Sequence, residues 1–312
     1  MKTNLLTATL ILATTALFAQ GSNNKVFYLD SLHNITTDKN YTYTRVVEDY
    51  DFKKDSYVVT EYYQSGKTSM TAISKDKNNL KLNGIRNDYY ENGNKKRESN
   101  YTNNILYGLQ LEWHENGEKK AEKEITWDVK NKSSIIKIKQ FWNKDKQQTI
   151  IDGNGQYEDT DENLYEKGLI KDGKKDGPWE GKNLRLNFSF KELYKKGELK
   201  SGISIDKNNN KFPYKELMVK PEPKKGMNNF YQYIGKNYKT PEIQGLKGKV
   251  YASFVVDKDG SLTDFKILRD IGYGTGKEAI RVLSNIENWK PGKMRGMAVR
   301  VLYSLPITIN TP

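Results

Sequence analysis

The chain contains no cysteine and only two histidines among its 312 residues. Without cysteine there is no disulfide, no thiol nucleophile, no cysteine-ligated zinc and no lipid on an N-terminal cysteine. The two histidines, His33 and His114, lie far apart in the sequence, and neither has a neighbour at the spacing of metal ligands or of a catalytic base. We therefore interpret both as ordinary surface side chains.

Motifs for binding phosphate or calcium are also lacking, although two stretches approach them. In GYGTGKE, Ile271 stands where a Walker A loop needs glycine, and Glu278 stands where it needs serine or threonine. In the acidic stretch from Asp152, Tyr157 stands where a calcium loop needs glycine. The sequence contains no convergent pair of carboxylates and no Ser–His pair. It therefore predicts a protein that is not an enzyme and binds no cofactor or metal.

Long apolar runs are absent except near the N-terminus, from Leu5 to Phe18. This run includes four threonines and is shorter than the roughly 20 residues that a membrane-spanning helix needs. We interpret residues 1–20 as a secretory signal peptide, cleaved near Ala19 or Gln20, with an uncleaved membrane anchor as the alternative. Export argues against nucleic acid as a partner, despite a net charge of +13.

Residues 21–212 contain an internal repeat. The stretch LNGIRNDYYENGNKK from Leu82 recurs as LYGLQLEWHENGEKK from Leu106, and EYYQSGK, ending at Lys67, is an earlier copy. In each copy aromatic residues end a strand, Asn-Gly or Ser-Gly makes a tight turn with positive φ, and a strand returns. One hairpin cannot bury its own face, so we expect neighbours to pair into an extended antiparallel β-meander. The pattern resembles the bacterial MORN-type repeat, which implies a spacer or a surface that docks a protein.

Three of the eight prolines fall within PYKELMVKPEPKKG, from Pro213 to Gly226. This composition predicts a stiff, hydrated linker over residues 213–225. It would separate the repeat domain, residues 21–212, from a C-terminal domain, residues 226–312.

The C-terminal domain is expected to contain two helices and three strands. The pattern predicts a helix over 230–238, strands over 249–256 and 262–269, a helix over 275–287 and a last strand over 298–309. Thr275 and Glu278 have the spacing of a capping box at the start of the second helix. The order helix-β-β-α-β predicts one helical layer on an antiparallel sheet. The chain overall is therefore expected to be α+β, with a β-meander followed by a ββαβ domain.

In the last strand, AVRVLYSLPITI, every odd position is apolar, whereas the even positions are mixed and include Arg300, Ser304 and Thr308. Pro306 lies within it, although proline has no N–H to donate to a neighbouring strand. Proline is tolerated on edge strands, so the sequence predicts that this strand lies at an edge of its sheet.

Residues 226–309 resemble the C-terminal domain of the TonB family, through VDKDG, EAIRVL, WKPGK and VRVLYSLPI. The resemblance implies that the last strand binds the TonB box, a short extended segment of outer-membrane receptors, by strand addition. A proline at Val301 is then expected to abolish binding. Carried over position by position, the partner-binding strand consists of Val299, Arg300, Val301, Leu302, Tyr303, Ser304 and Leu305. Two interpretations stay open for Lys290, Lys293 and Arg295, together with Arg300: they steer a charged partner, or they are ordinary surface charge.

The resemblance also implies transmission of inner-membrane energy to those receptors. Here the N-terminal segment is expected to be cleaved and the proline-rich piece is short, so contact with inner-membrane motor proteins would need another component. The sequence thus predicts a periplasmic TonB-family protein that supports energy-dependent outer-membrane transport. The alternative is a non-transducing scaffold, whose repeats bind protein partners and whose C-terminal domain docks or forms a homodimer.

Overall fold

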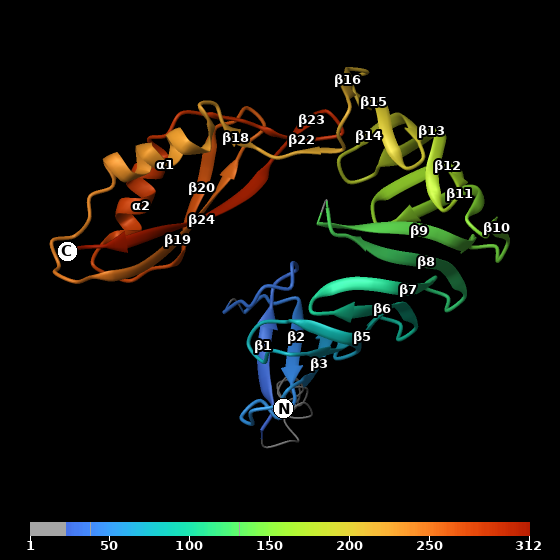
Figure 1. The fold of residues 1–312 in the computed structure, drawn as a ribbon, viewed down its shortest axis with the longest axis horizontal. Helices are drawn as coiled ribbons and strands as arrows, with labels where there is room; N and C mark the ends of the chain where they lie inside the picture. Colours follow the sequence, from blue (N-terminus) through green and yellow to red (C-terminus); the bar gives the residue numbers. More distant parts are fainter. Residues whose placement is uncertain (1–22, 38, 131) are drawn as a thin grey trace, which may run out of the picture. The chain divides into compact units, whose positions relative to one another are not determined.

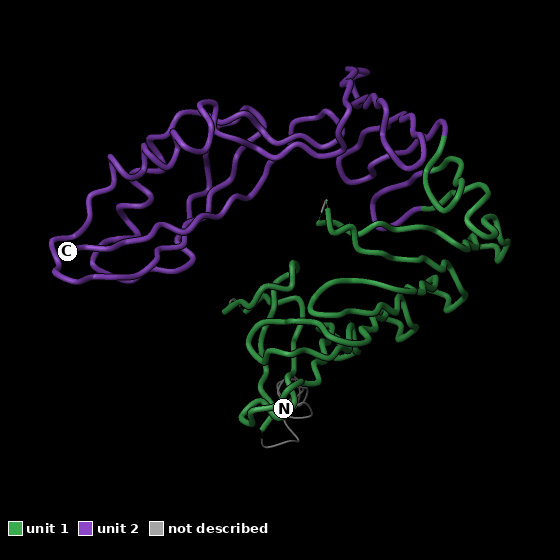
Figure 2. The backbone as a smooth tube through the Cα atoms, in the orientation of Figure 1, with its two compact units in different colours: residues 1–159, 167–176 green, residues 160–166, 177–312 purple. Residues whose placement is uncertain are grey.

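The computed structural model describes residues 23–312 except 38 and 131, so the expected signal peptide lies outside the described residues. The chain divides into two compact units (Figures 1 and 2). The first contains residues 1–159 and 167–176, and the second contains residues 160–166 and 177–312. The end of the repeat region, the expected linker and the C-terminal domain therefore belong to the same unit.

Sixteen strands form one sheet in which each strand lies beside its neighbours in sequence. This arrangement confirms the expected antiparallel meander, since the pairs along it are antiparallel. The strands are β1 (Lys25–Leu29), β2 (Tyr43–Val47), β3 (Tyr57–Tyr63), β4 (Thr68–Ser74), β5 (Leu82–Tyr89), β6 (Lys95–Thr102), β7 (Ile105–Trp113), β8 (Lys119–Asp128), β9 (Ser133–Trp142), β10 (Gln148–Ile151), β11 (Asn154–Asp161), β12 (Leu164–Lys171), β13 (Lys174–Asn183), β14 (Phe188–Lys195), β15 (Glu198–Asp206) and β16 (Lys211–Tyr214).

The repeated Gly turns have one hydrogen-bond pattern. The amides of Tyr63, Tyr90 and His114 each donate to the carbonyl four residues later, at 2.9, 2.9 and 2.8 Å. The glycine of each turn donates back to the first carbonyl, and its φ is positive, at 80°, 93° and 85° in chain order. The prediction of tight turns with positive φ is therefore confirmed for these copies.

A second hydrogen bond joins each turn to the next repeat. The hydroxyl of Tyr63 donates to the carbonyl of Tyr89 at 2.7 Å, and that of Tyr90 donates to Trp113 at 2.9 Å. His114 occupies the equivalent position in the following copy, and its Nε2 lies 2.9 Å from the carbonyl of Trp142. Because a carbonyl only accepts, this nitrogen carries the proton.

His114 is therefore not a surface side chain, and that prediction was wrong. It is 5% exposed, because it takes the place of a tyrosine between two repeats. The side chain of His33 is 41% exposed, but its Nδ1 lies 2.7 Å from the buried carboxylate of Glu61. Burial alone would raise the pKa of Glu61, but the hydrogen bond from His33 and the charge of Arg45 outweigh it and lower that pKa.

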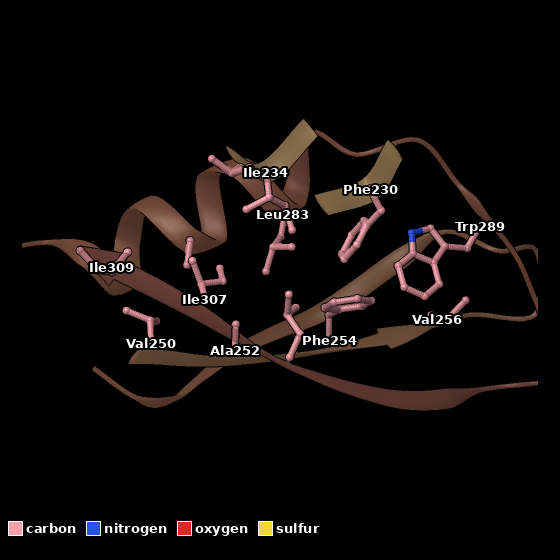
Figure 3. Close-up of a cluster of buried hydrophobic side chains, with 13 residues drawn as sticks. Phe230, Ile234, Val250, Ala252, Phe254, Val256, Leu283, Trp289, Ile307 and Ile309 are labelled. Carbon is pink, nitrogen blue, oxygen red and sulfur yellow. The ribbon is translucent and has the colours of Figure 1, made fainter. Parts of the chain in front are cut away.

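The C-terminal domain has α1 (Gly226–Asn237), β19 (Lys247–Val256), β20 (Leu262–Arg269), α2 (Thr275–Ser284) and β24 (Val301–Asn310). The long strands form a sheet in the order β20-β19-β24. Helix side chains such as Phe230 and Leu283 point toward strand side chains such as Ala252 and Phe254 (Figure 3). The expected helical layer on an antiparallel sheet is present. These are the two helices of the described residues, so the chain is mostly β.

The expected linker, residues 213–225, is folded rather than hydrated throughout. Pro221 and Pro223 are buried. The segment holds β17 (Met218–Val219) and β18 (Glu222–Pro223), which pair with β22 (Gly292–Met294) and β21 (Trp289–Lys290). β22 also pairs with β23 (Met297–Val299).

The expected capping box is wrong. The N-cap of α2 is Gly274, with φ 77°, and the helix ends at Ser284 rather than at residue 287. Thr275 is therefore the first residue inside the helix, its hydroxyl donates to Asp270 at 2.6 Å, and no side chain caps the helix. The carboxylate of Glu278 accepts from the amide of Lys239 at 2.8 Å and pairs with Arg281, so it binds a different segment.

We expect His114→Ala to lower the free energy of unfolding by about 2 kcal/mol, because the buried side chain is lost and the part-buried carbonyl of Trp142 loses its donor. His114→Tyr introduces the tyrosine that occupies the equivalent position 90, so it should retain most of the stability. Denaturant unfolding checks both values. His114→Phe removes only the donor, and stability equal to that of the wild type would contradict a role for this bond.

Glu278 should make the stability depend on pH. Hydrogen bonds from Arg281 and from the Lys239 amide lower its pKa from 4.5 to about 2. A carboxylate with a lowered folded-state pKa stabilises the fold above pH 4.5, and this contribution disappears as the pH falls toward 2. Glu278→Gln should therefore lower the melting temperature at pH 7, with a difference that shrinks toward pH 2. Glu287→Gln, at an exposed ion pair, is the control and should change little at either pH.

Candidate partner-binding site

β24 lies at the end of its sheet and pairs on one side only among the described residues. Its ladder with β19 runs without a register shift from Lys247 opposite Asn310 to Val256 opposite Val301. The prediction that Pro306 marks an edge strand is confirmed. Odd side chains such as Leu305 enter the core, whereas Leu302 is 61% exposed.

The hydrogen bond just beyond β24 indicates which of its backbone groups face outward. The amide of Thr311 donates to the carbonyl of Leu246 at 3.0 Å, in register with the ladder. Bonded and non-bonded pairs alternate in an antiparallel ladder, so the odd residues of β24 bond to β19. The even residues, including Leu302 and Ser304, turn their amides to the open side. The amide of Val301 faces β19, so a proline there would break the sheet rather than remove an outward donor.

The missing N–H of Pro306 therefore lies on the open side, where it costs the sheet no bond. Any added strand would lose a donor at that point. Pro306 limits the length of β24 that a partner can pair with continuously.

The expected strand from Ala298 is divided at Arg300, and Val299 belongs to β23. β23 pairs with β22 through a turn at Arg295 and Gly296, with φ 48° and 79°. Because the pair that closes a two-residue turn is hydrogen-bonded, the amide of Ala298 also faces away from β22. β23 is likewise an end strand. We call the outward backbone groups of residues 298–304 the free edge.

The charged residues predicted beside this strand have different surroundings. Arg300 is exposed and pairs with Asp257 at 3.1 Å and with Asp264 at 2.7 Å. Lys293 is exposed, and Lys290 is exposed and pairs with Glu222 at 2.8 Å. Arg295 is only 8% exposed, so an incoming segment cannot meet its charge, which is balanced by buried carboxylates.

Trp289 holds the core beneath β24, a role that the sequence analysis did not assign. Its ring lies 5.0 Å from that of Tyr303 on β24 and 5.5 Å from that of Phe254, centroid to centroid. Figure 3 shows Trp289 beside Phe254 in this core. Its amide donates to the carbonyl of Gly260 at 2.7 Å. A Cβ at Gly260 would lie 1.9 Å from the carbonyl oxygen of Trp289. The stretches VDKDG and WKPGK thus interlock through their backbones.

The described part of the chain offers few other sites. It contains no group of three or more His, Asp or Glu side chains arranged to hold a metal ion. Among the described residues, no helix has the length and apolar character needed to cross a membrane.

A family model for the Gram-negative bacterial TonB protein C-terminal domain matches residues 242–310. This segment is a TonB C-terminal domain. The match extends from the loop before β19 to the last residue of β24, and so includes the Gly260–Trp289 interlock and the free edge. It is a family of energy-transducer domains without enzymatic activity. Searches of curated proteins and of solved structures gave no match. The MORN-type character of the preceding sheet stays a prediction.

Gly260→Ala should destabilise the TonB C-terminal domain by at least about 2 kcal/mol, because the new Cβ meets a backbone oxygen and φ is positive. Gly274→Ala is the matched control. Its φ is also positive, at 77°, but nothing lies within 4 Å of the added atom. That change should cost about 1 kcal/mol. Thermal unfolding measures both, and equal losses would contradict the interlock.

Proposed function

We propose that this is a periplasmic TonB-family protein that binds the TonB boxes of outer-membrane receptors, in support of energy-dependent transport. The segment adds as a strand to the free edge. The observation that carries the proposal is the open side of β24 within a TonB C-terminal domain.

Strand addition fits the geometry of this edge. Exposed edges are commonly blocked by proline, bulges or covering segments. In β24 the proline comes only at position 306, and the ladder to β19 contains no bulge. Residues 298–304 leave room for a strand of roughly 20 Å, at about 3.3 Å per residue. Since backbone groups supply the bonds, many partner sequences with an extended backbone are acceptable.

Charge favours the approach of an acidic or neutral segment. Residues 224–312 hold 15 Lys and Arg against 7 Asp and Glu, a surplus of 8. Lys290 and Lys293 are exposed near the β22–β23 hairpin and are proposed to speed encounter rather than to fix affinity. Arg300 is held by two aspartates, so its contribution is smaller.

The alternative function, a scaffold, draws support from one face of the meander. Ile85 and Tyr107 both lie opposite Asn100 in the register, so they share a face across β5, β6 and β7. They are 50% and 46% exposed, and Leu109 on β7 is also 50% exposed. Exposed apolar patches often mark protein contacts. A scaffold of this kind need not bind TonB-box peptides.

Ser304→Pro should weaken binding of a TonB-box peptide at least about tenfold. It removes one outward N–H donor, and the proline ring obstructs the backbone of the added strand at that point. Pro306 demonstrates that β24 accommodates proline at an outward position. Thr308→Pro, beyond Pro306, is the matched control and should bind nearly as the wild type does. Calorimetric titration of the whole chain measures all three. Absence of binding to the wild type, or full binding by Ser304→Pro, would reject strand addition at this edge.

A further inference from the structure

Arg295, at the tip of the β22–β23 hairpin, is inserted into the last strands of the long sheet. Its Nε lies 2.8 Å from Glu192 on β14, and its terminal nitrogen lies 2.6 Å from Glu166 on β12. The guanidinium also lies over the ring of Phe190, 3.9 Å from its centroid. All four residues belong to the second unit. A residue of the TonB C-terminal domain is thus held by residues of the meander.

Glu192 is the centre of this contact. It is 4% exposed and accepts hydrogen bonds from the hydroxyls of Tyr214 at 2.6 Å and Tyr194 at 3.0 Å, besides that from Arg295. Burial, together with the neighbouring carboxylate, raises the pKa of both tyrosines, so they remain protonated donors. The buried carboxylate of Glu192 is therefore hydrogen-bonded both to the meander, through the two tyrosines, and to the TonB C-terminal domain, through Arg295.

Backbone bonds fix the same hairpin tip. The amide of Arg295 donates to the carbonyl of Leu217 at 2.8 Å, and the hydroxyl of Ser204 donates to the carbonyl of Arg295 at 2.8 Å. Beside it, a Cβ at Gly296 would lie 2.9 Å from the carbonyl oxygen of Phe212. The main chain of the tip is thus in close contact with β15, β16 and the segment after them.

These contacts favour an all-or-none association. Withdrawing Arg295 would leave the buried carboxylate of Glu192 without this counter-charge, which is far more costly than breaking an exposed pair. The exposed pair of Lys290 and Glu222 also joins the linker segment to the hairpin region, but water replaces it readily.

We propose that Arg295 and Glu192 form a rigid joint between the end of the meander and the TonB C-terminal domain. Tension on β24 then passes through Arg300 and β23 to Arg295, and from there into β14, rather than only along residues 213–225. The origin of this tension rests on the proposed function, since it would come from a receptor segment bound to β24. The joint between Arg295 and Glu192 exists whether or not such a segment binds.

Spin labels test the joint without background, because the chain has no cysteine. Ser201→Cys on β15 and Ser284→Cys at the end of α2 replace exposed serines on either side of the joint. In the full chain, pulsed electron resonance should give one narrow distance distribution. Arg295→Met, and separately Glu192→Gln, should broaden it at least twofold. Glu222→Gln, which removes the exposed pair, is the matched control and should leave it narrow.

A broad distribution in the labelled parent, or an unchanged narrow one in both joint variants, overturns the proposal. Arg295→Lys covers the case in which Arg295→Met does not fold. It keeps the charge but cannot reach two carboxylates with one planar fork, and it should broaden the distribution to an intermediate width. Peptide titration of the same samples separates the two proposals. If the labelled parent gives a narrow distance distribution but binds no peptide, the joint is supported and strand addition is rejected.

Discussion

Pairing of backbone hydrogen-bond groups is the constraint on which this structure depends. Each strand has two edges, and each edge must find another strand, a side chain or water. In the long sheet the next hairpin supplies the partner. In the C-terminal sheet β19 satisfies one side of β24, and the other side has no strand among the described residues. The proposed function follows from that asymmetry, because a row of unpaired amides and carbonyls is itself a binding surface.

The same constraint explains how the meander repeats. The last carbonyl of a strand, just before the tight turn, needs a donor. The hydroxyl of Tyr63 donates to that carbonyl in the next repeat, at Tyr89, and the hydroxyl of Tyr90 donates to the one at Trp113. His114 performs the same task with a ring nitrogen. The repeated position therefore requires a hydrogen-bond donor rather than one residue type. This accounts for a histidine in an aromatic position.

Features set by neighbours in sequence could be predicted. The alternation of β24, the positive φ of Gly93 and Gly117 and the order of the C-terminal elements all follow from local pattern. The sequence also indicated which residues of β24 turn their amides outward. Pro306 has no N–H and can only occupy a position that donates nothing to β19, so the even residues face outward. The prediction that a proline at Val301 would remove an outward donor overlooked this signal.

Features set by distant partners could not be predicted. The capping box failed because the helix begins one residue earlier than expected, with Gly274 at the N-cap, and because Glu278 accepts from the distant amide of Lys239. The burial of Arg295 depends on Glu192, 103 residues earlier, and nothing in the spacing of MRGM reveals it. In isolation a hairpin tip with Arg and Gly is typical of an exposed turn.

The joint at Arg295 is polar rather than apolar, and the direction of its hydrogen bonds explains why. An apolar plug at position 295 would bury similar area, but it would tolerate sliding over Phe190 and its neighbours. A guanidinium fork between Glu192 and Glu166 has directional bonds, so it fixes the rotation and the register of the hairpin as well as its depth. The free edge continues directly from that hairpin through Arg300. The position of β24 relative to the end of the meander is therefore set by a few directional bonds, and these must break together if the two are to separate.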